Sequence, residues 1–408
     1  MTPLAHRLAQ LPLDAVAAHW ERLDLDRASD AELIAAAVSQ LAAPIRAVTS
    51  SFQLHAPLEL LARAALLPRV EPRAREPARQ RIAEIVVRFV AEAEPAPRPA
   101  RAFHATARAG DTLLDAVTTG DADAADAALA YLLDHEPASA TFARLRPGLV
   151  DHLGAAAHAP IFLVEARRVL DRVPQVAALL HPLLRSLTET GDRLTWHRHP
   201  GGAARAPSIE RGSLAERLLT DRLLAPRRTE SASSFIAATM LAVERAGLAA
   251  DLIGDLWHRI ASVRAEALLS RLAAWSMLQD APDHAPYGWT HTLTLPQAVL
   301  QMTHGTADSP AAVAVAATYV LGFRATLGTV ALDPAAALPP PPLATPGARI
   351  TQLATAAALH RDAHFAKYVL ACFDASARDP SATELYLAAA ERLASYWHAR
   401  SASTTAAT

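Results

Sequence analysis

The order of apolar and polar residues along the chain follows the helical period in most segments. In "IAEIVVRFV" (82–90), apolar side chains recur at i, i+3, i+4, i+7 and i+8, which places them on one face of a helix. "DADAADAALAYLLDH" (121–135) begins with aspartates, which favour a helix N-terminus, and continues with spaced leucines. Stretches with the alternation of strands are nearly absent, so the pattern predicts an all-α protein.

Two helix starts are predicted from local signals. "WTHTLTL" (289–295) alternates, but it is short, and we expect an extended entry into a helix that begins at Pro296. In "SATELYL" (381–387), Ser381 stands at a capping position and Glu384 three residues later, which is the spacing of a capping box.

Clusters of Pro, Gly and charged residues predict four loops. They are "EPRAREPAR" (71–79), "EPAPRPAR" (94–101), "HRHPGGAARAPS" (197–208) and "DPAAALPPPPLATP" (333–346). No fixed-period repeat is evident. The pattern therefore predicts one large all-helical domain over residues 1–400, with long Pro-rich connecting loops, and a flexible tail over 401–408.

The composition narrows the class of protein. The chain has 408 residues, 51% of them hydrophobic and 20% charged, and a net charge of -2, which predicts a globular protein without affinity for nucleic acid or acidic lipid. Cys372 is the only cysteine, which excludes an internal disulfide and a Cys-rich metal site.

The most apolar stretch (311–323) is too short to cross a bilayer and predicts a buried helix. The N-terminal residues lack the pattern of a secretory signal, so we expect a cytoplasmic protein without a membrane partner.

Several motifs for enzymatic chemistry are missing. No two glycines have G-x-G spacing, so neither a dinucleotide fingerprint nor a phosphate-binding loop is present, and no G-x-S-x-G motif occurs. What remains is histidine, of which there are 17. The candidates in apolar, helical contexts are His55, His152, His158, His291, His360 and His364. Each alone is more typical of a hydrogen-bonded core residue than of a ligand.

Lys367 is the only lysine among 39 basic residues. His360, His364 and Lys367 are spaced i, i+4 and i+7, so they share a helix face, and the two histidines could bind one ion. An ammonium repels a metal, but burial and nearby positive charge can lower the pKa of a lysine until its amine is neutral. A neutral amine can react with carbon dioxide to form a carbamate, which is a carboxylate-like ligand that arginine cannot form. The alternative is a lysine that extends to solvent or pairs with Asp362 or Asp374.

Four segments together resemble the questin oxidase-like family. "HRDAHFAKYVLACFDASARDP" (360–380), with "ELYLAAAERL" after it, is similar to the C-terminal part of that family and its D-x-H-x-x-K core. "FQLHAPLELLARAAL" (52–66) resembles its early histidine motif, although the family often has a His-His pair where this chain has Leu58 and Glu59. "GAAAHAPIFLVEA" (154–166) and "GWTHTLTLPQA" (288–298) resemble its other two histidine segments, and all four occur in family order.

The resemblance implies an all-helical oxygenase that uses molecular oxygen on anthraquinones and related aromatic polyketides in secondary metabolism. The reaction would be oxidative ring cleavage or a Baeyer–Villiger-type oxygenation of such a substrate. It also implies a mononuclear non-haem Fe(II) ion held by four histidines and a carboxylated lysine. Carried over to this chain, the metal ligands are His55, His158, His291, His364 and Lys367, with His360 and His152 ranked below them. His364 and Lys367 would be the catalytic residues.

The chemistry of these side chains is consistent with that expectation. Imidazole suits iron, copper, nickel or zinc, and an added hard oxygen ligand favours Fe(II). Asp362, Glu165 and Thr294 are near enough in sequence to orient the imidazoles. Two alternatives stay open: a zinc or nickel hydrolase with a carbamylated lysine, and a non-catalytic helical scaffold whose histidines are structural. The sequence does not indicate an oligomeric state.

Overall fold

A computed structural model describes residues 2–46, 50–96, 101–198, 209–226, 235–341 and 344–405. Within these ranges the chain forms nineteen α-helices, several 3-10 turns and no β-strand; two isolated bridges, Ile45–Pro95 and His152–Arg193, are the only β-type pairings there. The predicted all-α class is confirmed.

The chain divides into two compact units. The first comprises residues 1–149, 161–192 and 354–366, and the second comprises residues 150–160, 193–353 and 367–408. The boundaries lie at the end of α8 (Ala138–Leu149), within α9 (Ala159–Leu170), α17 (Pro346–Leu359) and α18 (Ala363–Arg378), and in the segment that follows α10 (Leu180–Thr188). The single domain predicted over 1–400 stays a prediction.

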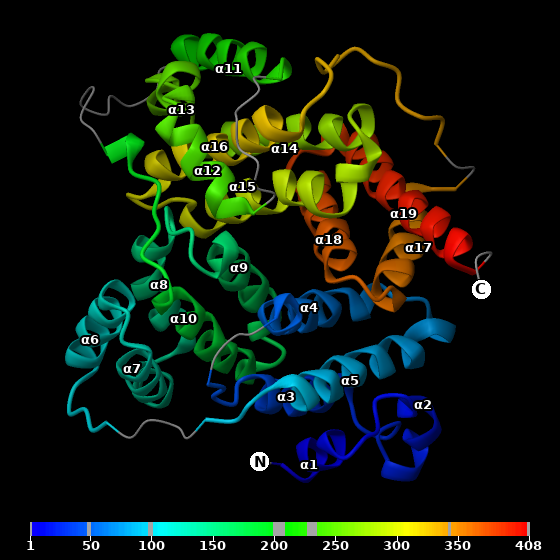
Figure 1. Ribbon diagram of the computed structural model, residues 1–408. Helices are drawn as coiled ribbons and strands as arrows, with labels where there is room; N and C mark the ends of the chain where they lie inside the picture. The colour runs from blue at the N-terminus through cyan, green and yellow to red at the C-terminus, as the bar shows by residue number, and fades with distance from the viewer. Residues whose placement is uncertain are drawn as a thin grey trace. The chain divides into compact units, whose positions relative to one another are not determined.

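The first unit is built from helices that precede residue 192. These are α1 (Pro3–Ala9), α2 (Val16–His19), α3 (Asp30–Leu41), α4 (Ser51–Leu66), α5 (Arg75–Glu92), α6 (Thr106–Thr119), α7 (Ala122–His135), α8 (Ala138–Leu149), most of α9 (Ala159–Leu170) and α10 (Leu180–Thr188). The end of α17 (Pro346–Leu359) belongs to it as well. α3, α4 and α5 pack against one another, and α6 lies beside α7 (Figure 1).

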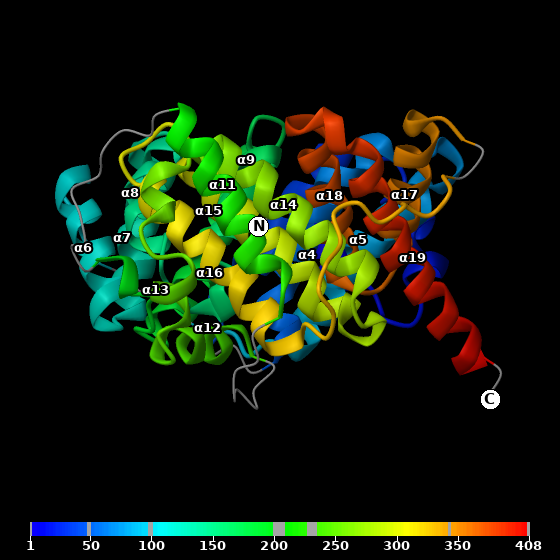
Figure 2. The same ribbon diagram turned by 90° about the horizontal axis from the view of Figure 1, so that it is seen from above.

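The second unit is centred on three apolar helices that pack against one another: α14 (Ser262–Gln279), α15 (Thr290–Thr303) and α16 (Ser309–Leu327) (Figure 2). Around them lie α11 (Ile209–Leu224), α12 (Ile236–Arg245), α13 (Leu248–Leu252), most of α18 (Ala363–Arg378) and α19 (Thr383–Thr405). α16 contains the predicted buried stretch. By length and composition it could cross a membrane, but 78% of its most apolar window is buried inside the structure, as in the core helix of a soluble protein.

Helix α15 corrects the expected extended segment at 289–295. The helix begins at Thr290 and contains Pro296, and every residue from Thr290 to Leu300 is buried. A helix buried on all sides needs no 3.6-residue pattern, so the alternation of threonine with larger residues carried no information about a strand. The threonine hydroxyls are satisfied within the helix, because Thr292 and Thr294 donate to the carbonyl oxygens four residues earlier at 3.0 and 3.1 Å.

The predicted loops are confirmed in part. The stretch 333–341 has no regular structure, and 94–96 is not helical. Residues 97–100, 199–208 and 342–343 of the predicted loops lie outside the described part. The loop expected at 71–79 is wrong beyond residue 74, because α5 begins at Arg75. Pro77 lies in the first turn of that helix, where a missing N–H breaks no helical hydrogen bond.

The start of α19 differs from the capping box expected at Ser381. Ser381 lies in a 3-10 turn (Pro380–Ala382), and its hydroxyl donates to Oδ1 of Asp379 at 2.8 Å. Asp379 also accepts two bonds from Arg271, at 2.6 and 2.7 Å, and one from Tyr386 at 2.9 Å. The carboxylate therefore joins α14 to α19. α19 continues to Thr405, so it extends into the residues predicted as a tail.

The Asp379 cluster predicts a loss of stability in acid. The Arg271 hydrogen bond holds the pKa of Asp379 below its usual value. A carboxyl whose pKa is lower in the folded protein contributes stability above its unfolded pKa of about 3.9, and this contribution is lost as the pH falls through the folded value. We expect Asp379→Asn to reduce the difference between the unfolding free energies at about pH 7 and about pH 3 in urea titrations. Replacing the exposed Asp14 with asparagine is the control. Equal pH dependence in both variants would contradict the assignment.

Candidate metal centre

His55 and His364 form one pair of imidazoles. His55 lies in α4, and its Nδ1 is 2.6 Å from the carbonyl oxygen of Ser51, one turn earlier. His364 lies in the first turn of α18, and its Nδ1 is 3.0 Å from Oδ1 of Asp362, which also accepts the backbone N–H of His364 at 2.7 Å. The ring centroids are 4.9 Å apart and the planes are tilted by 52°. One carboxylate oxygen thus sets both the start of α18 and the orientation of the ring.

His158 and His291 form the other pair. Nδ1 of His158 lies 3.1 and 2.7 Å from the carbonyl oxygens of Ala155 and Ala156, and Nδ1 of His291 contacts the carbonyl oxygen of Tyr287. Tyr287 belongs to a π-helical turn (Ala285–Trp289), a type of turn that is frequent at functional sites. Both histidines are buried, with 1% and 5% of their surface exposed.

The four hydrogen bonds fix which ring nitrogen carries the proton. A carbonyl or carboxylate oxygen can only accept, so in each ring Nδ1 must donate. A neutral imidazole then has its lone pair on Nε2, which is the arrangement of a histidine ligand whose second nitrogen is held by an acceptor. This holds for all four residues: His55, His158, His291 and His364.

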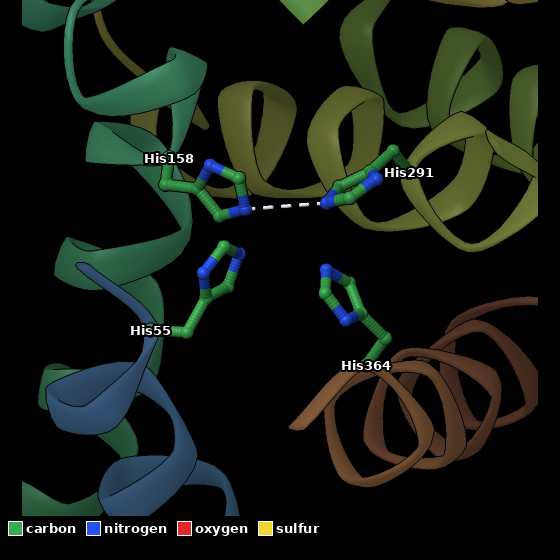
Figure 3. A group of neighbouring side chains, drawn as sticks. All are labelled: His55, His158, His291 and His364. Atoms are coloured by element: carbon green, nitrogen blue, oxygen red, sulfur yellow. Dashed lines mark hydrogen bonds between the residues drawn. The ribbon is translucent and has the colours of Figure 1, made fainter. Parts of the chain in front are cut away.

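The four imidazoles form a group that could hold a metal ion (Figure 3). One ligand nitrogen from each residue can be chosen so that all lie within 4.8 Å of one another. This group contains four of the five ligands that the sequence predicts.

The contact between His158 and His291 shows why a cation suits this place. Their Nε2 atoms are 3.2 Å apart (Figure 3). With both Nδ1 atoms protonated, neither neutral ring has a proton to place between the two lone pairs, so they repel. A shared proton would relieve the repulsion but would leave a buried positive charge on the pair. Two nitrogens bound to one ion at about 2.0–2.1 Å are about 2.8–3.4 Å apart for bond angles of about 90–109°. The observed spacing falls in that range.

The turn that carries His158 is strained. Ala155, Ala156 and Ala157 have φ values of 52°, 51° and 61°, so three successive alanines adopt the left-handed conformation. That conformation costs about 1–2 kcal/mol for each non-glycine residue and normally occurs at single positions. Because of this left-handed conformation, two consecutive carbonyl oxygens, those of Ala155 and Ala156, point at Nδ1 of His158.

Neighbouring contacts hold the strained turn in place. The N–H of Ala157 donates to Leu153 and Gly154 at 2.9 and 3.0 Å, and the N–H of Gly154 donates to Nδ1 of His152 at 2.9 Å. Asp151, just before the turn, accepts from Arg193 at 2.9 Å and also pairs with Arg198. Strain that persists under such constraints is typical of functional sites.

Relaxing the turn is expected to stabilise the protein. Glycine adopts positive φ without the steric penalty of alanine, and the extra entropy of glycine in the unfolded chain offsets part of the gain. We expect Ala156→Gly to raise the free energy of unfolding by about 0.5–1 kcal/mol in denaturant titrations. Ala267→Gly, in the middle of α14, should lower it by about 1 kcal/mol. Equal losses in both variants would rule out the strain.

The remaining predicted residues are placed differently. Nδ1 of His360 accepts the N–H of Asp362 at 3.0 Å, and Nδ1 of His152 accepts the N–H of Gly154, so both rings carry their proton on Nε2. This is the reverse of the four grouped histidines, and neither residue belongs to the group. Lys367 lies one turn after His364 in α18 and is 2% exposed.

Of the three residues expected to orient imidazoles, Asp362 contacts His364 as described. Thr294 donates to the carbonyl oxygen of Thr290, and Glu165 pairs with Arg168 at 3.5 Å. The carbonyl oxygens that hold the other three rings were not predicted, because a backbone acceptor has no sequence signal.

Comparison of the chain with protein-family models, with curated proteins and with solved structures found no match in any of the three. The family resemblance therefore depends on the four motifs themselves.

Proposed function

We propose that this protein is a non-haem, Fe(II)-dependent oxygenase that acts on a polycyclic aromatic or quinone-like compound. The observation that carries the proposal is that Nδ1 of each of the four histidines lies at an acceptor oxygen. Each Nδ1 faces an obligate acceptor, which leaves four Nε2 lone pairs, two of them 3.2 Å apart. Lone pairs arranged in this way are suited to a shared cation and poorly suited to a metal-free core.

The ligand chemistry supports iron among the metals that bind imidazole. His55, His158, His291 and His364 would hold the ion, and Lys367, as a carbamate, would add a hard oxygen donor. Nitrogen and oxygen ligands with an open position suit Fe(II), which would supply the redox chemistry with dioxygen.

The role of the protein residues is to orient and to exclude water. The carboxylate of Asp362 holds the Nδ1 proton of His364 and so makes its Nε2 a stronger donor. Backbone carbonyl oxygens hold the other three rings without adding negative charge. His158, His291 and Lys367 are at most 5% exposed, which keeps bulk water from these side chains.

The substrate class comes from the family resemblance alone. An aromatic polyketide such as an anthraquinone is the compound to test first, and a cytoplasmic location is part of the same proposal. Ring cleavage and oxygen insertion are both compatible with a site of this kind.

The test begins with protein purified without oxygen and stripped of metal. Adding Fe(II) should give about one bound ion per chain, and a panel of anthraquinones and related phenols should then be consumed together with oxygen. A hydrolase would turn over its substrate equally well without oxygen, and zinc or nickel would support it. A protein that binds no transition metal would be a scaffold, and the proposal would be wrong.

A further inference from the structure

A buried group of charged residues lies between α4, α5 and the end of α17 in the first unit. Glu59 and Arg63, one turn apart on α4, are 2% and 0% exposed, and Arg81 extends from α5. Oε1 of Glu59 accepts from Nε and Nη2 of Arg63 at 2.9 and 2.6 Å, and from Nη2 of Arg81 at 3.0 Å. One carboxylate oxygen therefore fixes two guanidinium groups.

The two arginines hold the end of α17 and the segment that follows it. Nη1 of Arg63 donates to the carbonyl oxygens of Ala357 and Ala358 at 3.2 and 2.5 Å, and Nη2 donates to that of His360. Nη2 of Arg81 donates to the carbonyl oxygen of Arg361 at 3.1 Å. The last carbonyls of a helix have no partner within the helix, and a cation there is favourable.

The segment 357–361, which Arg63 and Arg81 hold, leads directly to His364, a proposed metal ligand. Asp362 follows Arg361, its N–H donates to Nδ1 of His360, and its Oδ1 accepts both the backbone N–H and the Nδ1 proton of His364. His55 lies on α4 one turn before Glu59. The same helix therefore carries one imidazole and, through Arg63, holds the segment that orients the other.

We propose that Glu59, Arg63 and Arg81 are positioning residues that fix Asp362, and through it His364, against His55. This inference rests on the proposed metal site. It assigns a role to Glu59, one of the two positions at which the family that this chain resembles often has a His-His pair. The three side chains, which we call the carbonyl clamp, act through the backbone of residues 357–361 and touch no substrate.

Two physical arguments indicate that the carbonyl clamp serves to fix the segment before His364, and not to stabilise the fold as a whole. Burial lowers the pKa of the Arg63 guanidinium, a sign that its charge is unfavourably placed, although Glu59 counteracts this. Replacing a buried ion pair with apolar residues of similar size is often neutral for stability. A guanidinium fork, however, holds several acceptors in a fixed geometry, which an apolar side chain cannot do.

The test uses the double variant Glu59→Leu/Arg63→Met and two readouts. The first is hydrogen exchange at the amides of Asp362 and His364, which should become faster while exchange within α4 is unchanged. The second is the dissociation constant for Fe(II) without oxygen and for Zn²⁺, which should rise about 10–100-fold, as is usual when groups behind a metal ligand are removed. If the double variant does not fold, Arg63→Lys keeps the charge beside Glu59 but loses the fork, and the same changes are expected.

The control is Arg349→Met/Glu391→Leu. Arg349 is 2% exposed and lies on α17, but it binds the side chains of Glu391 and Glu384. Neither readout should change. Faster exchange with unaltered metal affinity would show a purely structural clamp and overturn the inference, as would no change in either readout. If the unaltered protein binds no metal, the proposed function fails, whereas the exchange measurement still reports on the clamp.

Discussion

Replacing His158 with alanine is expected to remove most of the stabilisation that a bound metal gives to the protein. Ligands that bind only the folded state stabilise it by RT ln(1 + [L]/Kd), which is about 4 kcal/mol when the free metal is 1,000 times Kd. Loss of a metal ligand should weaken binding by more than about 100-fold, since loss of an outer hydrogen bond alone costs 10–100-fold. At the same metal concentration, the stabilisation that metal gives to the His158→Ala variant should fall to about 1.4 kcal/mol or less.

The reason for choosing His158 lies in its contact with His291. Alanine removes one of two facing lone pairs, so the metal-free variant avoids the repulsion between the Nε2 atoms that are 3.2 Å apart. The loss should therefore be seen mainly in the difference between metal-loaded and metal-free protein. Thermal unfolding with and without Zn²⁺, and with Fe(II) in the absence of oxygen, measures that difference.

His181 provides the matched control. It is 2% exposed and its Nδ1 lies 3.0 Å from Oδ1 of Asp126, so it is a buried histidine with a structural partner and no place in the four-histidine group. His181→Ala should destabilise the protein with and without metal by the same amount. If His158→Ala behaves in the same way as His181→Ala, the histidines are core residues and the scaffold alternative is correct.

The sequence predicted the fold where helices are amphipathic. In α5 and α7 the spacing of apolar residues has a physical cause, because one face is buried and the other is solvated. It did not predict α15, because a helix buried all round has no such contrast, and Pro296 and the threonines read as signals of other structure. The arginine-rich start of α5 was predicted as a loop from its prolines and charges. It is helical because tertiary contacts, such as those of Arg79 with Asp30 and with the carbonyl oxygen of Leu25, satisfy those charges.

The candidate site was predictable in its side chains and not in its backbone. His55, His158, His291 and His364 were named from four motifs, and Asp362 from its position beside His364. No property of three alanines indicates a left-handed turn, since alanine is the strongest helix former. Arg63 was likewise one arginine among 38, and only its burial and its contacts with carbonyl oxygens distinguish it. Whether the group holds a metal is a question of chemistry that the His158→Ala experiment decides.

The second large effect is expected from bicarbonate. If Lys367 binds the metal as a carbamate, protein stripped of carbon dioxide should bind Fe(II) or Zn²⁺ more weakly, and added bicarbonate should restore the affinity. A carbamate forms from the neutral amine and carbon dioxide, so its oxygen becomes a donor only when carbon dioxide is present. Lys367 is 2% exposed and lies one turn after His364, so an oxygen on its end is held by the same helix as a proposed ligand. ¹³C-labelled bicarbonate would give a carbamate signal that disappears in Lys367→Met.

Three variants of Lys367 separate the carbamate from a lysine that is merely buried. Lys367→Glu supplies a carboxylate directly, so it should retain much of the metal affinity and lose the dependence on bicarbonate. Lys367→Arg stays charged at all accessible pH and should bind metal at least 10-fold more weakly whether or not bicarbonate is present. Lys367→Met keeps the apolar stem and should match the arginine variant in being insensitive to bicarbonate.

The carbamate would be removed from the proposal if the unaltered protein bound metal with the same affinity with and without bicarbonate. The four histidines would then remain as the whole ligand set, and zinc would become as good a candidate as iron, because the hard oxygen donor that favours Fe(II) would be gone.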